Sequence, residues 1–557
     1  MRVRRKMQSL AGVAVLALLA GCGAGGGATA GPGTANEPAR GAALNAEGTP
    51  VSGGTLRLSM NTDPLCLDPH AISSDVEQIF GHILTDNLIY LDEQGQPGPY
   101  LAESWQISPD GRTYTFKLRQ GVTFSDGTPF DAEAVRVNFE HMLDPTTRSP
   151  LAGPYIAPYK DSRIIDPYTI EVHLSVPYSP FLDVLAQGWL GLLSPKAINE
   201  TTPAQLCEKP IGSGPFVLTG YTKNQGVTFV RRPGYNWAPP QLKQTGEAKL
   251  DGIEVSWVGQ DAVRFNSLTG GQYEATGYVP AQNAAALKNN PNFVYANVNR
   301  IGLPYTVEFN TSRAPFDNLD VRRAFAAAVN VPAIVQTLGF GERQQSTSYV
   351  DRVTKYYDPA VKLPGFDPKL ANQLLDQAGW TSRNGDGYRT RDGRELVVQW
   401  PVSQAGTVSP IFDLIQAQVK SVGIRVNIQL LPSTQVTTLR YAGDYDLTYG
   451  VWHTNTPDVL YIKYASFSIP NSKRLGQNTS HLSDPQVDQW LDQARQTTDQ
   501  ATQQKLYSQV QGRLAQLVPG IPVYDNSVLW AFSRKLHNVS VDTSHGTPLF
   551  TYAWLEK

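Results

Sequence analysis

Strand-like and helix-like segments alternate along most of this chain, and no internal repeat organises them. Apolar residues take every second position from Tyr114 to Leu118, which is typical of a strand with one buried face. From Ala371 to Ala378 they fall at helical spacing, in a segment that opens at Asp367 and ends at Gly379. The sequence therefore predicts a mixed α/β protein, long enough for two or three lobes.

The first residues carry the pattern of an export signal. Basic residues cluster within the first six positions, and an apolar run from Leu10 to Ala20 follows. That run is too short to cross ~30 Å of hydrocarbon as a helix. It closes on Leu-Ala-Gly-Cys at positions 19–22, which resembles the lipobox of bacterial lipoproteins. The resemblance implies a signal peptide at residues 1–21 and a diacylglycerol on Cys22; in an ordinary secretory signal, the alternative, Cys22 is incidental.

Residues 22–52 are mostly small or polar, with almost no large apolar side chain. Such a segment cannot bury enough surface to offset its ordering entropy, so we expect a flexible tether. No later stretch approaches the ~18 uninterrupted apolar residues of a spanning helix. We therefore expect the folded body outside the cell, anchored by lipid to the outer face of the membrane, in a periplasm or on a cell surface.

Composition and cysteine count narrow the partners. The net charge is only −2, so no basic surface of the kind that binds nucleic acid is expected, and we expect a monomer. Beyond Cys22 only Cys66 and Cys207 remain, and an exported protein can bridge such a pair. A disulfide requires Cα atoms within about 7 Å, which the sequence does not give. A bridge and two free thiols therefore both stay open.

Sequence signatures of catalysis and metal binding do not occur. The chain contains no H-E-x-x-H, C-x-x-C or G-x-S-x-G motif. The Asp-Gly turns between Asn384 and Gly393 lack the glutamate that ends an EF-hand loop. The 8 histidines show no metal-ligand spacing. The sequence thus predicts a protein that is not an enzyme and has neither a metal site nor a cofactor.

A set of ordered motifs resembles one family. The run from Leu101 to Phe130 contains Leu-Ala-Glu-Ser-Trp, Ser-Pro-Asp-Gly and Asp-Gly-Thr-Pro. The segments Pro210–Phe216, Phe309–Thr311 and Gly443–Leu447 follow in the family's order. Together they resemble the bacterial extracellular solute-binding proteins of the peptide/nickel class (family 5), over essentially everything from Gly53 to Val539.

The resemblance implies a periplasmic-binding-protein-like α/β fold of the class II, cluster C type, in which two lobes close on a ligand. It places lobe I at residues 53–84, 198–304 and 521–557, a subdomain inserted into lobe I at 85–197, and lobe II at 305–520. The chain would cross between the lobes twice. Such crossings suit hinge bending, where a few residues absorb the backbone change.

Members of this family are lipoprotein components of ATP-driven (ABC) importers. The resemblance implies that the chain captures a peptide or peptide-like small solute and delivers it to two permease subunits with their ATPases. Two other hypotheses stay open: a receptor of the same fold that signals without transport, and a lipid-anchored hydrolase. A dipeptide, an oligopeptide, an opine, a sugar or a metal chelate all remain as ligands.

The segment from Trp452 to Asp458 matches the family's ligand-binding loop. In peptide-binding members an aspartate here pairs with the ligand's α-amine by a charge-assisted hydrogen bond, and Asp458 matches it by position. Val459 stands where the family commonly has proline, so a turn aspartate capping a helix is the alternative. Trp452 is expected to line the pocket or fill the core, and His453 to contact ligand or solvent.

Four further residues are candidates for ligand contact. Ser73 and Ser74 follow the first strand, where the family places ligand-facing residues, although either could cap a helix. Asn310 is expected near the hinge, in contact with ligand or with backbone groups. Gln404 lies in a loop, residues 403–407, that has no Arg or Lys for a ligand carboxylate. A strict dipeptide receptor is therefore not expected, because an unpaired buried carboxylate is costly.

Overall fold

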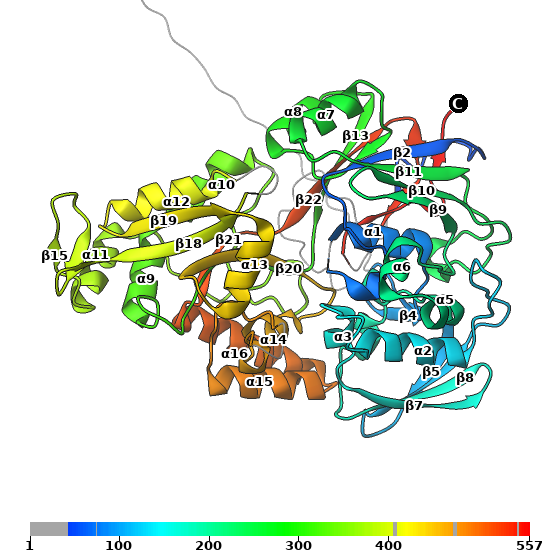
Figure 1. The fold of residues 1–557 in the computed structure, drawn as a ribbon, viewed down its shortest axis with the longest axis horizontal. Coiled ribbons are helices and arrows are strands. Elements are labelled where there is room, and N and C mark those ends of the chain that lie inside the picture. The colour runs from blue at the N-terminus through cyan, green and yellow to red at the C-terminus, as the bar shows by residue number, and fades with distance from the viewer. Residues whose placement is uncertain (1–42, 74, 405–408, 472–475, 543–544) are drawn as a thin grey trace, which may run out of the picture. The chain divides into compact units, whose positions relative to one another are not determined.

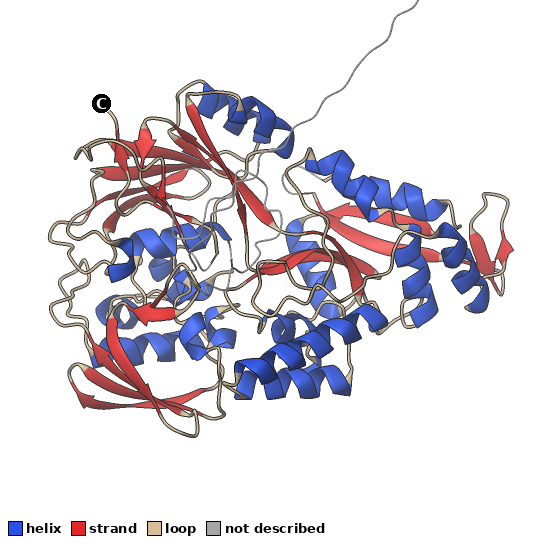
Figure 2. Cartoon of the chain, turned by 180° about the vertical axis from the view of Figure 1, so that it is seen from behind, coloured by secondary structure: helices blue, strands red, loops and turns tan. Residues whose placement is uncertain are grey.

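The computed structural model describes residues 43–73, 75–404, 409–471, 476–542 and 545–557, all within one compact unit that spans residues 37–557. The signal peptide, Cys22, most of the tether and Ser74 lie outside the described residues. Strands and helices alternate throughout the unit (Figures 1 and 2). Among the described residues, no helix combines the length and apolar character needed to cross a bilayer.

Lobe I is built on a seven-stranded mixed sheet with the order β13-β22-β12-β2-β11-β10-β9. β2 pairs in parallel with β11 and β12, and β13 pairs antiparallel with β22. The strands are β2 (Thr55–Met60), β9 (Phe216–Thr222), β10 (Gly226–Arg231), β11 (Gly252–Trp257), β12 (Ala275–Thr276), β13 (Phe293–Asn299) and β22 (Ser527–Ser533). Its helices include η1 (Pro69–Ala71), α1 (Asp75–Leu84), α5 (Pro195–Glu200), α6 (Pro203–Glu208), α7 (Asp261–Thr269) and α8 (Ala284–Lys288).

The chain's last residues complete lobe I with two small sheets. In one, β24 (Val539–Val541) pairs with both β1 (Ala43–Leu44) and β25 (Pro548–Leu549); in the other, β23 (Leu536–His537) pairs with β26 (Trp554–Leu555). The Gly-rich segment Pro210–Phe216 packs on the end of α1, where the Gly214 amide donates to the Leu84 carbonyl over 2.9 Å. A Cβ at position 212 or 214 would collide with the Leu84 backbone, so only glycine permits this approach.

The inserted subdomain is a four-stranded antiparallel sheet, β5-β6-β8-β7, covered by α2. The strand expected from Tyr114 to Leu118 is β6, and the apolar side of α2 is buried in the same core. Its elements are β3 (Ile89–Leu91), β4 (Pro97–Pro99), β5 (Ala102–Ile107), β6 (Thr113–Leu118), α2 (Ala132–Leu143), α3 (Ala152–Tyr155), β7 (Tyr159–Asp166), β8 (Thr169–Leu174), α4 (Phe181–Val184) and η2 (Gly188–Leu190).

Lobe II contains a three-stranded sheet, β20-β14-β21, and a parallel pair, β18-β19. The strands are β14 (Gly302–Phe309), β18 (Val397–Ser403), β19 (Arg425–Leu431), β20 (Leu447–His453) and β21 (Gly520–Tyr524), with a small sheet of β15 (Ser382–Arg383), β16 (Arg389–Arg391) and β17 (Arg394–Glu395). The helices are α9 (Leu319–Ala328), α10 (Val331–Gly339), α11 (Pro368–Gln377), α12 (Ile411–Lys420), α13 (Ser433–Ala442), α14 (Val459–Tyr464), α15 (Pro485–Gln496) and α16 (Gln500–Leu517). The helix expected from Ala371 to Ala378 is α11, capped by Asp367.

Two adjacent connections join the lobes. β13 leads into β14 through Arg300–Ile301, and β21 leads into β22 through Asp525–Asn526. The Arg300 amide donates to the Asn526 carbonyl over 2.9 Å, so the two connections are bonded to each other. Strand pairing puts β14 and β21 in one sheet and β13 and β22 in another, so each connection passes between these two sheets. Sequence motifs mark segments of a family but do not reveal which residues of a strand pair in which sheet.

A disulfide joins Cys66 to Cys207, with the Cα atoms 4.4 Å apart. Cys66 lies in the loop after β2, and Cys207 lies on α6. The Leu67 amide also donates to the Cys207 carbonyl over 2.8 Å. The bridge therefore fixes the loop that leads from the first strand of lobe I toward the inserted subdomain.

Candidate functional site

The loop that follows β20 is enclosed between lobe II and the inserted subdomain. His453, Thr454, Asn455, Thr456 and Asp458 are each less than one-tenth exposed. The loop lies at the boundary between the lobes, because β20 ends at His453. This residue pairs with Gly302, the first residue of β14 after the interlobe connection Arg300–Ile301. A loop buried in this way must find hydrogen-bond partners for its polar side chains.

Asp458 forms an ion pair with an arginine of its own chain. Its Oδ1 lies 2.9 Å from Nε of Arg495, on α15, and its Oδ2 accepts a hydrogen bond from the Tyr178 hydroxyl over 3.0 Å. Asp458 does precede α14, but its side chain makes no capping hydrogen bond. Burial raises the pKa of the Asp458 carboxyl, while the charge of Arg495 and the Tyr178 hydrogen bond oppose that rise.

Arg495 is held by aromatic rings as well as by charge. Its guanidinium lies 3.7 Å from the ring centroid of Tyr461 and 4.9 Å from that of Tyr178. Burial lowers the pKa of Arg495, but Asp458 and Tyr178 outweigh burial and hold that pKa above its ordinary value. Tyr178 belongs to the inserted subdomain, whereas Asp458 and Arg495 belong to lobe II. Its contacts with both charged side chains therefore cross the boundary between the two.

Other polar contacts cross the same boundary, which we call the seam. The Gln187 amide donates to Thr454 Oγ1 over 3.2 Å and to Asn455 Oδ1 over 3.0 Å. The Asn455 amide donates to the Asp183 carbonyl over 2.5 Å. Trp452 Nε1 donates to the Tyr155 hydroxyl over 3.3 Å, and the indole packs against the cores on both sides. Trp452 is therefore a contact of the seam rather than a residue of one core.

A cavity of about 160 Å³ opens at the seam, lined by Ser179 and Asp183 on one side and by Lys355, Thr456 and Gln503 on the other. It is smaller than the roughly 300–1,000 Å³ of sites that enclose small ligands. A ligand as large as a peptide would therefore require the two sides to separate before it could enter.

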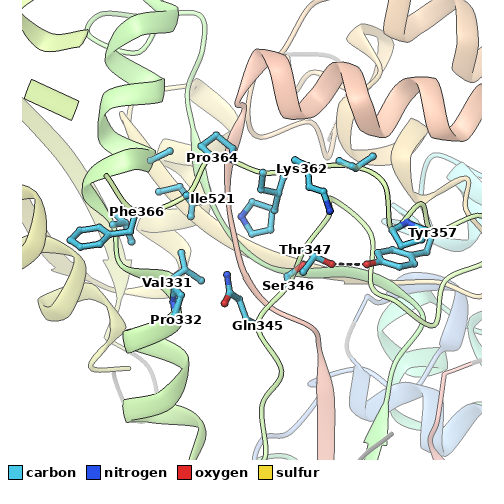
Figure 3. Close-up of a pocket in the computed structure, with 18 residues that line it drawn as sticks. Val331, Pro332, Gln345, Ser346, Thr347, Tyr357, Lys362, Pro364, Phe366 and Ile521 are labelled. Atoms are coloured by element: carbon cyan, nitrogen blue, oxygen red, sulfur yellow. Dashed lines mark hydrogen bonds between the residues drawn. The ribbon is translucent and has the colours of Figure 1, made fainter. Parts of the chain in front are cut away.

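A second cavity, of about 320 Å³, lies wholly within lobe II. Figure 3 shows its lining, where the Thr347 and Tyr357 hydroxyls share a hydrogen bond of 2.6 Å and Lys362 is the charged side chain. Most of the other lining residues are aliphatic or proline. Because every wall comes from one lobe, closure of the lobes does not form this cavity, and we do not assign it to the interlobe ligand.

Of the other candidate residues, Asn310 bonds to backbone within lobe II, and Ser73 and Gln404 lie at the surface. The Asn310 amide donates to the carbonyls of Gly443 and Tyr445 over 3.0 and 3.1 Å, which is the backbone role that was one of its two alternatives. Asn310 follows β14, at the opposite end from Gly302, roughly 25 Å along the strand. Ser73 and Gln404 are exposed, and the loop after Gln404 lies outside the described residues.

Sequence reasoning missed Arg495 and Tyr178. Both are far from Asp458 in the chain, in a helix and a loop whose local patterns predict nothing about ligands. The loop around Gln404 has no Arg or Lys that could bind a ligand carboxylate. In the folded protein a guanidinium, that of Arg495, lies at the seam.

Two buried carboxylates lie at the interlobe connections: Asp525 belongs to one of them, and Asp351 bonds to it. Asp351 Oδ1 accepts the Asn526 amide over 3.0 Å, and Asp525 lies 3.0 Å from Nη1 of Arg352. Burial, reinforced by the charge of Asp525, raises the pKa of Asp351 well above its ordinary value. Burial also raises the pKa of Asp525 to about 6, although Arg352 opposes the rise.

We expect the contribution of Asp525 to the free energy of unfolding to fall as the pH rises from about 4 to about 6. In this range the folded state keeps the proton of Asp525, whereas the unfolded state, with a pKa near 3.8, has lost it. Asp525→Asn removes this titration, so the variant's free energy of unfolding should rise relative to that of the wild type over the same window. Denaturant unfolding at a series of pH values measures the difference.

The control is Asp386→Asn, which changes an aspartate that is 76% exposed. This variant should follow the wild-type pH dependence. Equal slopes for the wild type and Asp525→Asn would contradict the assignment of a raised pKa to Asp525.

Comparison with known proteins gives one consistent result. The model of the bacterial extracellular solute-binding proteins, family 5, matches residues 96–473. The glutathione-binding protein GsiB of Escherichia coli K12 is 29% identical over 475 residues, 84% of this chain and 88% of GsiB.

Two solved structures show the same fold. The periplasmic binding protein DppA from Helicobacter pylori, in complex with the peptide STSA, superposes with a TM-score of 0.78 at 24% identity, over 91% of this chain and 99% of DppA. NikA from Brucella suis, in complex with Fe(III)-EDTA, gives a TM-score of 0.77 at 21% identity, over 90% and 100%. The expected two-lobed α/β fold is confirmed.

Proposed function

Because the chain belongs to the bacterial extracellular solute-binding proteins of family 5, we propose that it captures a peptide-like solute between its lobes and delivers it to a membrane permease. Proteins of this family are substrate-binding components of ABC importers for peptides or related solutes, and they are not enzymes. The observation that carries the proposal is the buried Asp458–Arg495 pair, completed across the seam by Tyr178.

The hinge and the seam together suit a receptor that closes on its ligand. Arg300–Ile301 and Asp525–Asn526 are short adjacent connections, so a small backbone change there can move one lobe against the other. A ligand that touches both lobes favours the closed state by its differential affinity for that state. The contacts of Gln187 and Tyr178 show which side chains of the inserted subdomain reach lobe II.

The chemistry of the seam suggests a ligand with a free amine and a free carboxylate. Asp458 would pair with the amine, as the family resemblance implies, and Arg495 would pair with the carboxylate. Without ligand, Asp458 and Arg495 pair with each other, because a buried charge without a counter-charge is costly. A ligand's amine and carboxylate would replace these internal partners. A relative that binds glutathione, a peptide with both kinds of group, agrees with this choice.

We test the ligand class with a thermal-shift screen of the full chain, purified in detergent, against glutathione, short peptides, opines, sugars and metal chelates. A ligand that binds only the folded state stabilises it by about 2.7 kcal/mol at a hundredfold excess over its Kd. We expect peptides to raise the melting temperature. No shift from any peptide, with a shift from a sugar or a chelate, would reject the peptide assignment.

The lipid anchor on Cys22 is part of the same proposal. The Leu-Ala-Gly-Cys sequence directly after the apolar run supports it. The wild type should partition with membranes and incorporate labelled palmitate, and Cys22→Ser should do neither. Equal membrane partitioning of the two proteins would reject the anchor and leave the receptor function untouched.

Transport distinguishes import from signalling by a receptor of the same fold. Cells that carry the chain and a neighbouring permease should take up the bound peptide, and loss of the chain should abolish that uptake. Binding without any dependence of uptake on the chain would favour the signalling function.

A further inference from the structure

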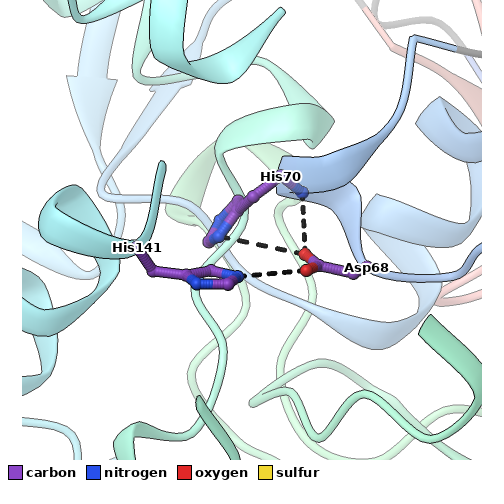
Figure 4. Close-up of side chains that lie close together, drawn as sticks. All are labelled: Asp68, His70 and His141. Atoms are coloured by element: carbon purple, nitrogen blue, oxygen red, sulfur yellow. Dashed lines mark hydrogen bonds and ion pairs between the residues drawn. The ribbon is translucent and has the colours of Figure 1, made fainter. Parts of the chain in front are cut away.

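Two histidines and an aspartate meet where lobe I joins the inserted subdomain. Asp68 and His70 lie at η1, after the first strand, and His141 lies in the last turn of α2. One ligand-type atom from each residue lies within 4.8 Å of the others (Figure 4). Sequence patterns do not reveal this cluster, because the two histidines are 71 positions apart in the chain.

Asp68 and His70 are buried, His141 is partly exposed, and one ring nitrogen lacks a hydrogen-bond partner. The exposed fractions of the side chains are 2% for Asp68, 0% for His70 and 10% for His141. Within the described part of the chain, Nδ1 of His70 has no hydrogen-bond partner, although it lies only 4.0 Å from Oδ1 of Asp68. A buried polar atom without a partner is rare in proteins and calls for a group that satisfies it.

The surroundings orient both imidazoles toward the carboxylate. Nε2 of His70 lies 2.9 Å from the Gly191 carbonyl, which can only accept a hydrogen bond, so Nε2 carries the proton and the lone pair of His70 is on Nδ1. Nδ1 of His141 lies 3.1 Å from the Thr147 hydroxyl, and Nε2 lies 3.0 Å from Oδ2 of Asp68. A backbone carbonyl or hydroxyl behind each histidine is the usual second partner of a metal-bound imidazole.

We propose that Asp68, His70 and His141 bind a zinc ion, through Oδ2, Nδ1 and Nε2 respectively, in a site separate from the ligand seam. Bonds of about 2.0–2.1 Å in a tetrahedral zinc site place the ligand atoms roughly 3.3 Å apart, close to the 3.0 Å between His141 and Asp68. Water would complete the coordination, reaching the ion on the partly exposed side of His141.

Zinc binding requires small proton movements that the neighbours can accommodate. In the structure as it stands, Nε2–H of His141 donates to Asp68 and the Thr147 hydroxyl donates to Nδ1. When Nε2 binds zinc, the proton moves to Nδ1 and the Thr147 hydroxyl rotates to accept it. His70 needs no such change, because the Gly191 carbonyl keeps its proton on Nε2 and leaves the lone pair on Nδ1.

Such a zinc ion would reinforce a junction that is already restrained on its other side. The Cys66–Cys207 disulfide precedes Asp68 by two positions and ties the same loop to α6. The zinc would tie this loop to α2 of the inserted subdomain. The subdomain that contributes Tyr178 and Gln187 to the seam would then be fixed to lobe I.

The test is the zinc content and zinc affinity of the full chain. The protein is stripped with EDTA, exchanged into chelator-free buffer and titrated with Zn²⁺ by calorimetry, and bound zinc is counted by mass spectrometry of the metal. We expect one zinc per chain. In His141→Gln, whose amide can still donate to Asp68, the affinity should fall by roughly 100-fold or more, and in Thr147→Val by roughly tenfold.

The matched control is His173→Gln, which changes a surface histidine that lies 2.5 Å from Asp161 and 3.6 Å from Glu171. This variant should bind zinc as the wild type does. Loss of zinc in His173→Gln but not in His141→Gln would overturn the proposal and indicate adventitious binding at the surface. So would a wild-type protein that takes up no zinc.

A spectroscopic measurement covers the case in which His141→Gln fails to fold. Wild-type protein loaded with Co²⁺ should show the visible absorption of a four-coordinate nitrogen–oxygen site, and one equivalent of Zn²⁺ should remove it. A Co²⁺ spectrum of the fully hydrated ion would overturn the proposal without any variant.

Discussion

Replacing Asp458 with alanine is expected to lower the free energy of unfolding by about 3–5 kcal/mol, because Arg495 is then buried without its counter-charge. The two side chains are only 4% and 15% exposed, so water cannot replace the lost carboxylate. The Tyr178 hydroxyl also loses its acceptor. Denaturant unfolding of the wild type and the variant at neutral pH measures the loss.

The matched control is the neutral double variant Asp458→Asn with Arg495→Gln. It removes both charges and keeps hydrogen-bonding side chains, so it should regain much of the stability that Asp458→Ala loses. Ligand binding should remain lost in the double variant, because neither charge is present. A change of less than about 1 kcal/mol in Asp458→Ala would contradict a buried ion pair at the seam.

Removal of the Cys66–Cys207 disulfide should produce an effect of similar size. The bridge closes a sequence separation of 141 residues, and in the chain-entropy model so long a loop restricts the unfolded state by about 5 kcal/mol. Measured losses are commonly smaller, so we expect a decrease of about 3–5 kcal/mol in the free energy of unfolding for Cys66→Ala with Cys207→Ala.

The reduced wild-type protein provides the comparison for this double variant. Treatment with a reductant should lower its stability to nearly that of the double variant, and the double variant should not respond to reductant. A wild-type protein whose stability is the same with and without reductant would contradict the disulfide. Cys22 does not complicate the comparison, because it is present in all samples.

Much of the fold could be predicted because local patterns and global structure agree. The alternation from Tyr114 to Leu118 became β6, and the cap at Asp367 begins α11. Ordered motifs supported the two-lobed fold, and the Gly-rich motif near Gly212 is explained by its contact with Leu84. The pairing of strands could not be predicted, because β14 and β21 are more than 200 positions apart in the chain and pair only in the folded protein.

Candidate site residues could be named from the sequence only where they lie together in one short segment. Trp452 and His453 end β20, and Asp458 lies in the loop that follows, so the family motif suggested the three together. Arg495 reaches Asp458 from another helix, and the sequence around it is that of an ordinary amphipathic helix. The proximity of His70 and His141 could not be predicted either, because only tertiary packing brings the two residues together.

Equilibrium titration tests the central claim most directly, that this chain binds a peptide-like solute through the charges at the seam. The full chain is titrated by calorimetry with the peptide that gives the largest thermal shift, and with the same peptide acetylated at its amine and amidated at its carboxylate. We predict one site per chain, and at least tenfold weaker binding of the blocked peptide, equivalent to about 1.4 kcal/mol. Equal affinities for the two peptides would contradict recognition by Asp458 and Arg495, and the absence of saturable binding by any peptide would contradict the receptor function itself.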